Sequence, residues 1–291
     1  MSPPDLYARA PLCRRGTIPV FSETSDYICN YEKIATDHLE AQNKTGQNPW
    51  IEERFWLEME QSTAHMIRKY AKPGQRILDV GVGLGRVLSG FPELERYGVD
   101  ISFDYLEEAR KRGINVCYAL VEELPYTAEY FDLVVCADVL EHVLDLTLAC
   151  RNILSVLKKG GHLIIRVPYR ENLAPYLLPS CPYKYVHLRN FDEHSLRLLL
   201  ERIFGCEVLE ISLTGHGASS VKFRDLLPAS PTPGLFSKMA VAAKKILKVA
   251  GTLLKSISED AYNTFRRGLY QPAEINVVAR KADSKESERG G

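Results

Sequence analysis

Residues 76–86 read RILDVGVGLGR, a short apolar strand that runs directly into a turn with three glycines. Glycine adopts positive φ easily and has no Cβ, so the main-chain N–H groups of such a turn can face a ligand. A second strand pattern ends fifteen residues after Gly85, at Asp100, where a carboxylate would accept hydrogen bonds from both hydroxyls of a ribose. The strand, the glycine turn and the spaced acid together predict a nucleotide-type ligand site, which three glycines alone would not do.

Strand and helix patterns alternate through the rest of the core. The predicted strands cover residues 76–81, 95–99, 114–118, 131–137, 161–167, 208–213 and 274–280, and the predicted helices cover 85–91, 103–112, 145–158 and 192–203. A further helix is predicted between Pro49 and the first strand, because aromatic and apolar residues recur there at helical spacing. This alternation predicts an α/β fold, a mostly parallel sheet with helices on both faces. Ligands in such sheets bind at the carboxyl ends of the strands.

Three segments resemble the class I S-adenosylmethionine-dependent methyltransferases. LDVGVGLG at 78–85 is similar to their first motif, and VCADVLEHV at 135–143 resembles the Glu-His-Val signature after the fourth strand of a large small-molecule branch. LKKGGHLII at 157–165 resembles their glycine turn and fifth strand. The resemblance covers residues 70–215 and the final strand. It implies a Rossmann-like sheet of seven strands with an antiparallel last strand, and S-adenosyl-L-methionine as the cofactor.

The resemblance also implies how the glycine turn would hold the methionine and ribose parts of the cofactor. Gly81, Gly83 and Gly85 would let the loop pass beneath the methionine part. Asp79 would orient the turn or, through water, the cofactor ammonium. Asp100 would bind the ribose hydroxyls. No metal ligand set is expected.

The adenine side of the predicted site departs from the family pattern. Leu120 stands where the family often has an aspartate that binds the adenine amino group, so Val121 and Glu122 are the expected substitutes. Ile101 would press on the face of the adenine ring, because an apolar wall suits a flat aromatic ligand. Asp138, at the end of the fourth strand, completes the predicted cofactor set.

Methyl transfer from a sulfonium depends mainly on alignment, and a base helps only when the acceptor is a hydroxyl. His142 and His187 are the candidate catalytic bases, since the pKa of histidine suits neutral pH. The segment around His187 resembles a His-x-Arg-x-Phe segment that lines the acceptor side in related enzymes. A structural role in hydrogen bonding the backbone stays open for His142. Tyr27 and Tyr31 would either cover the sulfonium by a cation–π contact or attach the N-terminal arm.

Composition limits the classes of partner and compartment. The chain of 291 residues has 37 basic and 37 acidic residues, so it lacks the positive field expected of a nucleic-acid-binding protein. The seven cysteines form no Cys-x-x-Cys pair, which argues against a zinc site and favours reduced thiols in a cytoplasmic protein. The N-terminus has no secretory-signal pattern, and no apolar run approaches the length of about 20 residues that a membrane span needs.

The expected domain organisation has four parts. Residues 1–48 would form an irregular arm or lid, and 49–281 the methyltransferase domain. Residues 215–273 would be a helical insertion between the sixth and seventh strands, and 282–291 a disordered tail.

The insertion contains a basic amphipathic pattern at residues 235–258. On a helix, one stripe comprises Met239, Ala243, Ile246, Ala250, Leu253 and Ile257, and the opposite side comprises Lys238, Lys244, Lys245, Lys248 and Lys255. Such a helix can lie in the interface of an anionic membrane. It can also be a lid whose apolar stripe packs on the core, or a dimer contact, and these interpretations stay open.

The expected function is that of a cytoplasmic S-adenosylmethionine-dependent methyltransferase. The expected acceptor is an oxygen atom of a small molecule, a glycan or a lipid-linked intermediate. Two other classes remain: a nicotinamide-dependent oxidoreductase, which prefers Gly-x-Gly-x-x-Gly, and a protein that binds the cofactor at the membrane without turnover.

Overall fold

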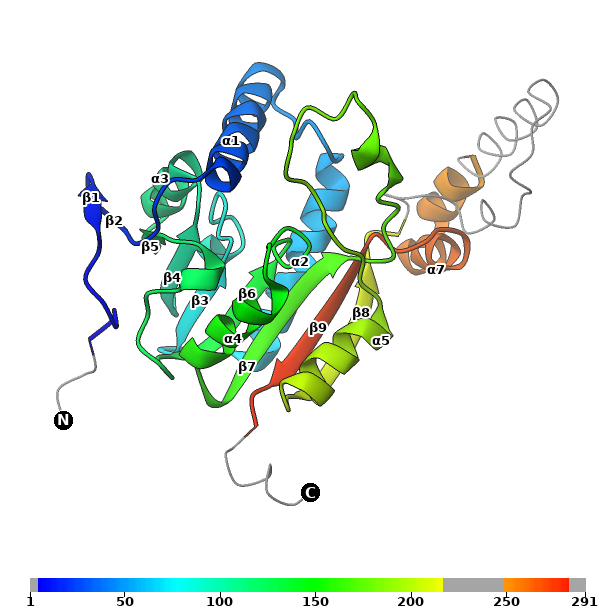
Figure 1. Cartoon of the computed structure of the whole chain (residues 1–291). Helices are drawn as coiled ribbons and strands as arrows, with labels where there is room; N and C mark the ends of the chain where they lie inside the picture. The colour runs from blue at the N-terminus through cyan, green and yellow to red at the C-terminus, as the bar shows by residue number, and fades with distance from the viewer. Residues whose placement is uncertain (1–4, 217–248, 283–291) are drawn as a thin grey trace. The chain divides into compact units, whose positions relative to one another are not determined.

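The computed structural model describes residues 5–216 and 249–282 and divides into two compact units (Figure 1). The first unit comprises Met1–Thr214 and Glu274–Gly291, and the second comprises Gly215–Ala273. The second unit therefore interrupts the first between two strands of its sheet.

The sheet of the first unit has the strand order β1-β2-β5-β4-β3-β6-β7-β9-β8. Its central strands run parallel: β5 (Asn115–Tyr118), β4 (Glu95–Asp100), β3 (Arg76–Val80), β6 (Phe131–Ala137) and β7 (Leu157–Pro168). β9 (Glu274–Arg280) lies between β7 and β8 (Glu207–Thr214) and is antiparallel to both. The predicted α/β class and the antiparallel last strand are confirmed.

The described sheet has nine strands rather than the expected seven, because the N-terminal segment adds a hairpin. β1 (Cys13–Arg15) and β2 (Ile18–Val20) pair antiparallel. β2 then joins the edge of β5 through the pair Val20 and Tyr118. The hairpin thus covers an edge of the sheet that would otherwise expose unpaired backbone groups.

The expectation of an irregular segment at residues 1–48 was wrong, because α1 (Asp26–Thr45) is a helix of 20 residues. The side chain of Ser25 caps its start by accepting a hydrogen bond from Ile28 N, and Gly46 ends it in the left-handed conformation with φ 70°. Its buried side chains are Tyr27, Ile28, Ala35 and His38. Apolar periodicity is weak in this segment because two of its four buried side chains, Tyr27 and His38, carry polar groups. The two caps, by contrast, mark the ends of the helix clearly.

The other helices follow the predictions with one exception. α2 (Glu53–Tyr70), α3 (Phe103–Lys111) and α4 (Leu146–Val156) are confirmed, and α5 (Glu193–Arg197) continues as a π-helical turn, Leu198–Ile203. Short 3-10 turns occupy Val121–Glu123 and Ala174–Leu177.

The helix predicted at residues 85–91 is only a 3-10 turn, Leu88–Gly90. Gly85 has φ 69°, which is incompatible with a right-handed helix at that residue. Pro92 disfavours the helical conformation at Phe91, so the turn cannot extend in the other direction either.

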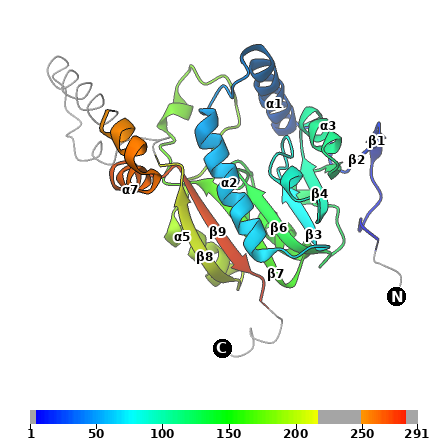
Figure 2. The same ribbon diagram turned by 180° about the vertical axis from the view of Figure 1, so that it is seen from behind.

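Helices cover both faces of the sheet, as the two opposite views show (Figures 1 and 2). On one face Val134 and Cys136 of β6 pack in one cluster with residues of α4 and α5. On the other face Leu133 and Val135 pack with residues of α1, α2 and α3. The alternation along β6 follows from the two-residue period of a strand. The helices pack on the two faces of the sheet, so the carboxyl ends of the strands remain available for a ligand site.

The second unit contributes two described helical stretches. Residues 249–257 are helical, and α7 (Glu259–Leu269) follows after Ser258, whose side chain caps it. Val249, Leu253 and Ile257 are exposed and stand four residues apart, on one side of the first stretch. Most of the basic pattern predicted at 235–258 lies outside the described residues. Within 5–216 and 249–282, no helix is both long and apolar enough to cross a membrane.

Candidate active site

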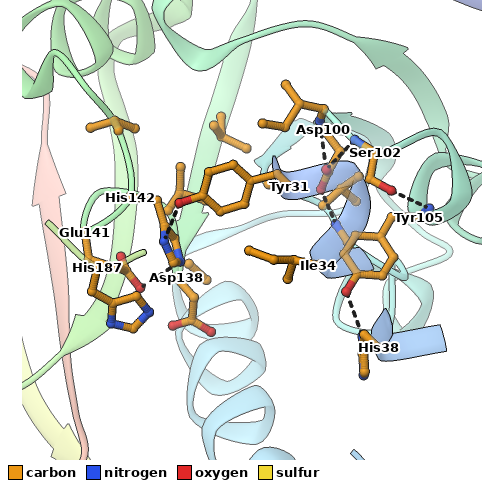
Figure 3. Close-up of a pocket in the computed structure, with 18 of the residues that line it drawn as sticks. Tyr31, Ile34, His38, Asp100, Ser102, Tyr105, Asp138, Glu141, His142 and His187 are labelled. Atoms are coloured by element: carbon orange, nitrogen blue, oxygen red, sulfur yellow. Dashed lines mark hydrogen bonds and ion pairs between the residues drawn. The ribbon is translucent and has the colours of Figure 1, made fainter. Parts of the chain in front are cut away.

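A cavity of about 770 Å³ opens at the carboxyl ends of the parallel strands. Its walls come from α1, α2 and the loops that follow β3, β4, β5, β6 and β7. Figure 3 shows Asp100 on one side and His142 with His187 on the other, with Tyr31 and Ile34 of α1 between them. Of the predicted site residues, the structure brings these to the cavity: Asp79, Gly81, Gly83, Asp100, Ile101, Val121, Glu122, Asp138, His142 and His187.

Gly85 is the predicted residue that does not line the cavity. A Cβ at this position would lie 2.6 Å from Ile114 Cδ1 and 3.0 Å from Ala109 Cα. Gly85 therefore lets α3 and the following chain approach the loop, which is a packing role.

Gly83 faces open space in the cavity. It has φ 50°, and a Cβ built on it would meet no atom within 4 Å. By contrast, a Cβ on Gly81 would lie 2.3 Å from Val139 Cγ2. The loop thus presents bare backbone to the cavity at Gly83 and packs tightly against the β6 side at Gly81.

The carboxylate of Asp100 is held by three backbone N–H groups. Oδ2 accepts from Gly83 N at 2.9 Å, and Oδ1 accepts from Ile101 N at 2.8 Å and Ser102 N at 3.0 Å (Figure 3). Burial raises the pKa of Asp100, and these three donors oppose that shift. Each carboxylate oxygen has about two acceptor directions, so Oδ2 keeps one for a ligand hydroxyl, whereas both directions of Oδ1 are used by Ile101 N and Ser102 N.

Asp79 lies beneath the loop and is 6% exposed. Burial raises its pKa well above the ordinary value, while the nearby Arg166 lowers it. A cationic group bound above Asp79 would favour its ionised form.

The side of the cavity predicted to hold adenine has an apolar wall and one polar candidate. Ile101 follows β4, and Val121 begins the 3-10 turn after β5. Leu120 contributes its backbone N–H to Ser22 Oγ at 2.9 Å, so this group is already used. Glu122 Oε1 accepts from Leu144 N at 3.2 Å, while its buried Oε2 has no hydrogen-bond partner among the described residues.

Asp138 is engaged by an arginine that sequence analysis did not identify. Arg166 of β7 is 4% exposed and donates to Asp138 Oδ1 from Nε at 3.1 Å and to Oδ2 from Nη2 at 2.5 Å. It also donates from Nη1 to Thr63 Oγ1 of α2 at 2.9 Å. An arginine inside the apolar run 163–167 was the available signal, because a buried charge needs a partner.

Two histidines meet at the end of the cavity that is remote from Asp100. The ring centroids of His142 and His187 are 4.5 Å apart. His142 Nδ1 lies 3.0 Å from Tyr31 Oη, and His187 Nδ1 lies 2.5 Å from Glu171 Oε2. Burial and the neighbouring His187 lower the pKa of His142 to about 3, so its imidazole is neutral.

A backbone hydrogen bond from Leu188 N to Glu141 O, 2.8 Å, holds the two histidine segments together. Arg189 adds a donor to Leu140 O at 2.8 Å. Glu171 was not predicted, because it lies sixteen residues before His187 in an irregular segment without a spacing pattern. For Tyr31 the two predicted roles were a contact with the cofactor sulfonium and attachment of the N-terminal arm; its hydrogen bond to His142 joins α1 to the segment after β6, as attachment requires.

The comparisons with known proteins agree with this geometry. A methyltransferase domain family matches residues 78–165. The chain is 33% identical over 182 residues to the ubiquinone/menaquinone biosynthesis C-methyltransferase UbiE of Vibrio parahaemolyticus, covering 54% of this chain and 69% of that protein. It is 38% identical over 174 residues to an uncharacterized protein of Methanocaldococcus jannaschii, covering 60% and 84%. The chain belongs to the class I S-adenosylmethionine-dependent methyltransferases.

Solved structures show the same fold at lower identity. A methyltransferase described as a possible histamine N-methyltransferase from Thermotoga maritima matches with a TM-score of 0.52 and 20% identity, covering 87% of this chain and 99% of that one. A Haloferax volcanii methyltransferase complex matches with a TM-score of 0.54 and 15% identity, covering 90% and 100%. Family membership decides against the nicotinamide-dependent oxidoreductase that the glycine pattern had left open.

Proposed function

We propose that this methyltransferase binds S-adenosylmethionine in the cavity and transfers the methyl group to an oxygen atom of a small molecule, a glycan or a lipid-linked intermediate. The observation that carries the proposal is a single cavity with the carboxylate of Asp100 at one side and His187, which is paired with Glu171 outside the cavity lining, at the other. A donor and an acceptor bound at these two sides would meet between them.

In this proposal the cofactor follows the loop from the adenine side to the methionine side. Ile101 and Val121 cover the adenine, and Glu122 lies beside them in the wall of the cavity. Asp100 accepts from a ribose hydroxyl through the remaining acceptor direction of Oδ2. The methionine part crosses the open space at Gly83, with its ammonium near Asp79.

His187 is the proposed base, and Glu171 orients it. Because Glu171 engages Nδ1, Nε2 is left to accept a proton, as in other histidine–carboxylate pairs. The acceptor hydroxyl gives its proton to Nε2, and its oxygen forms a bond to the methyl carbon. The electron pair of the breaking carbon–sulfur bond remains on sulfur, which leaves S-adenosylhomocysteine. His142 is the weaker base, because its lowered pKa disfavours protonation.

Carbon is the competing acceptor atom, because the Vibrio parahaemolyticus relative is described as a C-methyltransferase. Support for oxygen comes from the base: a hydroxyl must lose a proton during transfer, and the His187–Glu171 pair can take it. The balanced charge of 37 basic and 37 acidic residues continues to disfavour nucleic acid as the acceptor.

We also propose peripheral attachment to an anionic membrane through the segment 235–258, in an otherwise cytoplasmic protein. Among the described residues of this segment, Val249, Leu253 and Ile257 are exposed apolar side chains on one helix side. Lipid-linked acceptors would be presented at such a surface. The seven free cysteines fit a reducing compartment.

The test uses cofactor labelled with ¹³C in its methyl group. The enzyme is incubated with this cofactor and separate aqueous and lipid extracts of cells, and the labelled product is examined by mass spectrometry and NMR. We expect one labelled component whose ¹³C chemical shift is that of an O-methyl group. A C-methyl shift would overturn oxygen as the acceptor. Cofactor binding by calorimetry without any labelled product would instead indicate a binding protein without turnover.

A further inference from the structure

Glu141, His142 and His187 place three metal-ligating groups together at the acceptor end of the cavity (Figure 3). One ligand atom from each lies within 4.8 Å of the other two. A point equidistant from three atoms 4.8 Å apart is about 2.8 Å from each (4.8/√3). Side-chain movements of less than about 1 Å would bring all three ligand atoms to 2.0–2.2 Å from the ion, the distance typical of nitrogen and oxygen ligands.

Glu141 is the member whose environment most needs a cation. Its side chain is 1% exposed, and neither carboxylate oxygen has a hydrogen-bond partner in the described part of the chain. Both oxygens are almost inaccessible to a water-sized ligand, so neither solvent nor an acceptor hydroxyl satisfies them. A small ion between the side chains would stabilise its charge.

The two histidines are oriented as metal ligands usually are. A ligating imidazole normally has its second nitrogen engaged by a carboxylate or another outer partner, which fixes the ring. Glu171 Oε2 engages His187 Nδ1, and Tyr31 Oη engages His142 Nδ1. His142 Nε2 then faces Glu141 Oε1 at 3.8 Å.

We infer that Glu141, His142 and His187 bind a divalent transition-metal ion that coordinates the acceptor oxygen. Two imidazole nitrogens and one carboxylate oxygen suit Zn²⁺, Mn²⁺, Fe²⁺ or Co²⁺ better than Mg²⁺, which prefers oxygen ligands alone. Three protein ligands leave positions open for substrate oxygen.

This inference rests on the proposed function and changes one step of it. When the ion occupies His187 Nε2, that nitrogen no longer takes the proton. The acceptor hydroxyl binds the ion, and the ion lowers the pKa of that hydroxyl. The hydroxyl then loses its proton to water, and its oxygen takes the methyl group.

The experiment measures metal binding directly, apart from turnover. Purified full-length protein is treated with chelator, dialysed and titrated with Co²⁺, Zn²⁺ or Mg²⁺, using calorimetry and the visible absorption of Co²⁺. We expect about one Co²⁺ or Zn²⁺ per chain and at least tenfold weaker Mg²⁺ binding. Glu141→Gln and His187→Asn should each weaken Co²⁺ binding by at least tenfold. Tyr31→Phe, which keeps the ring and removes only the outer hydroxyl, should weaken it less.

His162→Asn is the matched control, because this histidine packs against Tyr70 and does not line the cavity. Co²⁺ binding should be unchanged in it, and thermal melting should verify that each variant is folded. Binding of less than one tenth of an ion per chain to wild type would overturn the inference. So would equal Co²⁺ affinity of wild type and a folded His187→Asn variant.

Measuring the turnover of the enzyme in the presence of chelator separates this inference from the proposed function. Full methylation of the labelled component in metal-free enzyme would overturn the role of the ion and leave the proposed function intact. Metal binding with the expected variant pattern, but a product methylated on carbon, would overturn the acceptor proposal and leave the metal site intact.

Discussion

Gly83 N donates a hydrogen bond of 2.9 Å to Asp100 Oδ2, so the glycine loop after β3 is tied directly to the acid after β4. The same carboxylate accepts from Ile101 N and Ser102 N through its other oxygen. Asp100 therefore fixes the loop in the free enzyme, and in the proposed function its Oδ2 also accepts a hydrogen bond from a ribose hydroxyl. A substitution at Asp100 affects both.

Asp100→Ala should weaken S-adenosylmethionine binding by about 1.5–3 kcal/mol, the scale of hydrogen bonds to a charged group. Asp100→Asn should lose less, because one amide oxygen still accepts from a backbone N–H or a hydroxyl. Calorimetry checks both values. A cofactor analogue without ribose hydroxyls provides the control: it should bind wild type and Asp100→Ala with similar affinity. If wild type and Asp100→Ala discriminated against the analogue by the same factor, the ribose assignment would be wrong.

Gly83→Val should abolish measurable cofactor binding while the protein stays folded, because the new side chain would project into the open space of the cavity. Gly74→Val is the matched control. Gly74 also has positive φ, 77°, and open space around its Cβ position, but it does not line the cavity. Both variants should melt at lower temperature because of backbone strain, and only Gly83→Val should lose binding. Normal affinity in Gly83→Val would exclude the loop from the site.

Local patterns predicted the sheet and most of the residues that line the cavity at its strand ends, and they failed where the partners are distant in sequence. The strand before Gly81 and the acid at Asp100 are each recognisable within a few residues, since strand period and glycine conformation are local properties. The pairing of Glu171 with His187 depends on the path of an irregular segment, which no periodicity describes. Arg166 could be recognised from the sequence as a charged residue inside an apolar strand, but its pairing with Asp138 could not.

His187→Asn should lower turnover by roughly 10²- to 10⁴-fold with nearly unchanged cofactor affinity, because the group that deprotonates or coordinates the acceptor would be lost. Glu171→Gln should lower turnover less, since it disturbs the orientation of His187 and leaves its ring in place. Steady-state rates and cofactor calorimetry together make the measurement. Wild-type turnover in both His187→Asn and His142→Asn would show that alignment alone, or another base, drives the reaction.

His38 should make the ligand-free protein less stable in mild acid. Burial and the neighbouring Arg86 lower its pKa from the ordinary 6.5, so the unfolded state binds the proton more tightly than the folded state. The stability that neutral His38 contributes is present above pH 6.5 and is lost as pH falls towards the lowered pKa. His38→Gln can retain a hydrogen bond to Tyr105 Oη without titrating. Denaturant unfolding at several pH values should therefore show a smaller acid loss in His38→Gln. An equal pH dependence in both proteins would contradict this role.

Membrane attachment through residues 235–258 should require anionic lipid and weaken with salt, since the Debye length falls from about 10 Å at 0.1 M to about 3 Å at 1 M. Vesicle flotation at low and high salt measures it. Charge reversal at Lys244, Lys245 and Lys248, which lie outside the described residues, should release the protein from vesicles. Leu253→Asp and Ile257→Asp should also release it without lowering the melting temperature, because these side chains are 59% and 79% exposed.

Reversal of three lysines in the first unit provides the control for membrane attachment. These lysines are 62–73% exposed, and their reversal changes the net charge equally, so flotation should be unchanged; they are Lys44, Lys111 and Lys184. A lid predicts the opposite pattern: the lysine reversals would be silent, and Leu253→Asp would impair turnover in solution. Absence of flotation on anionic vesicles at low salt would exclude the membrane interpretation.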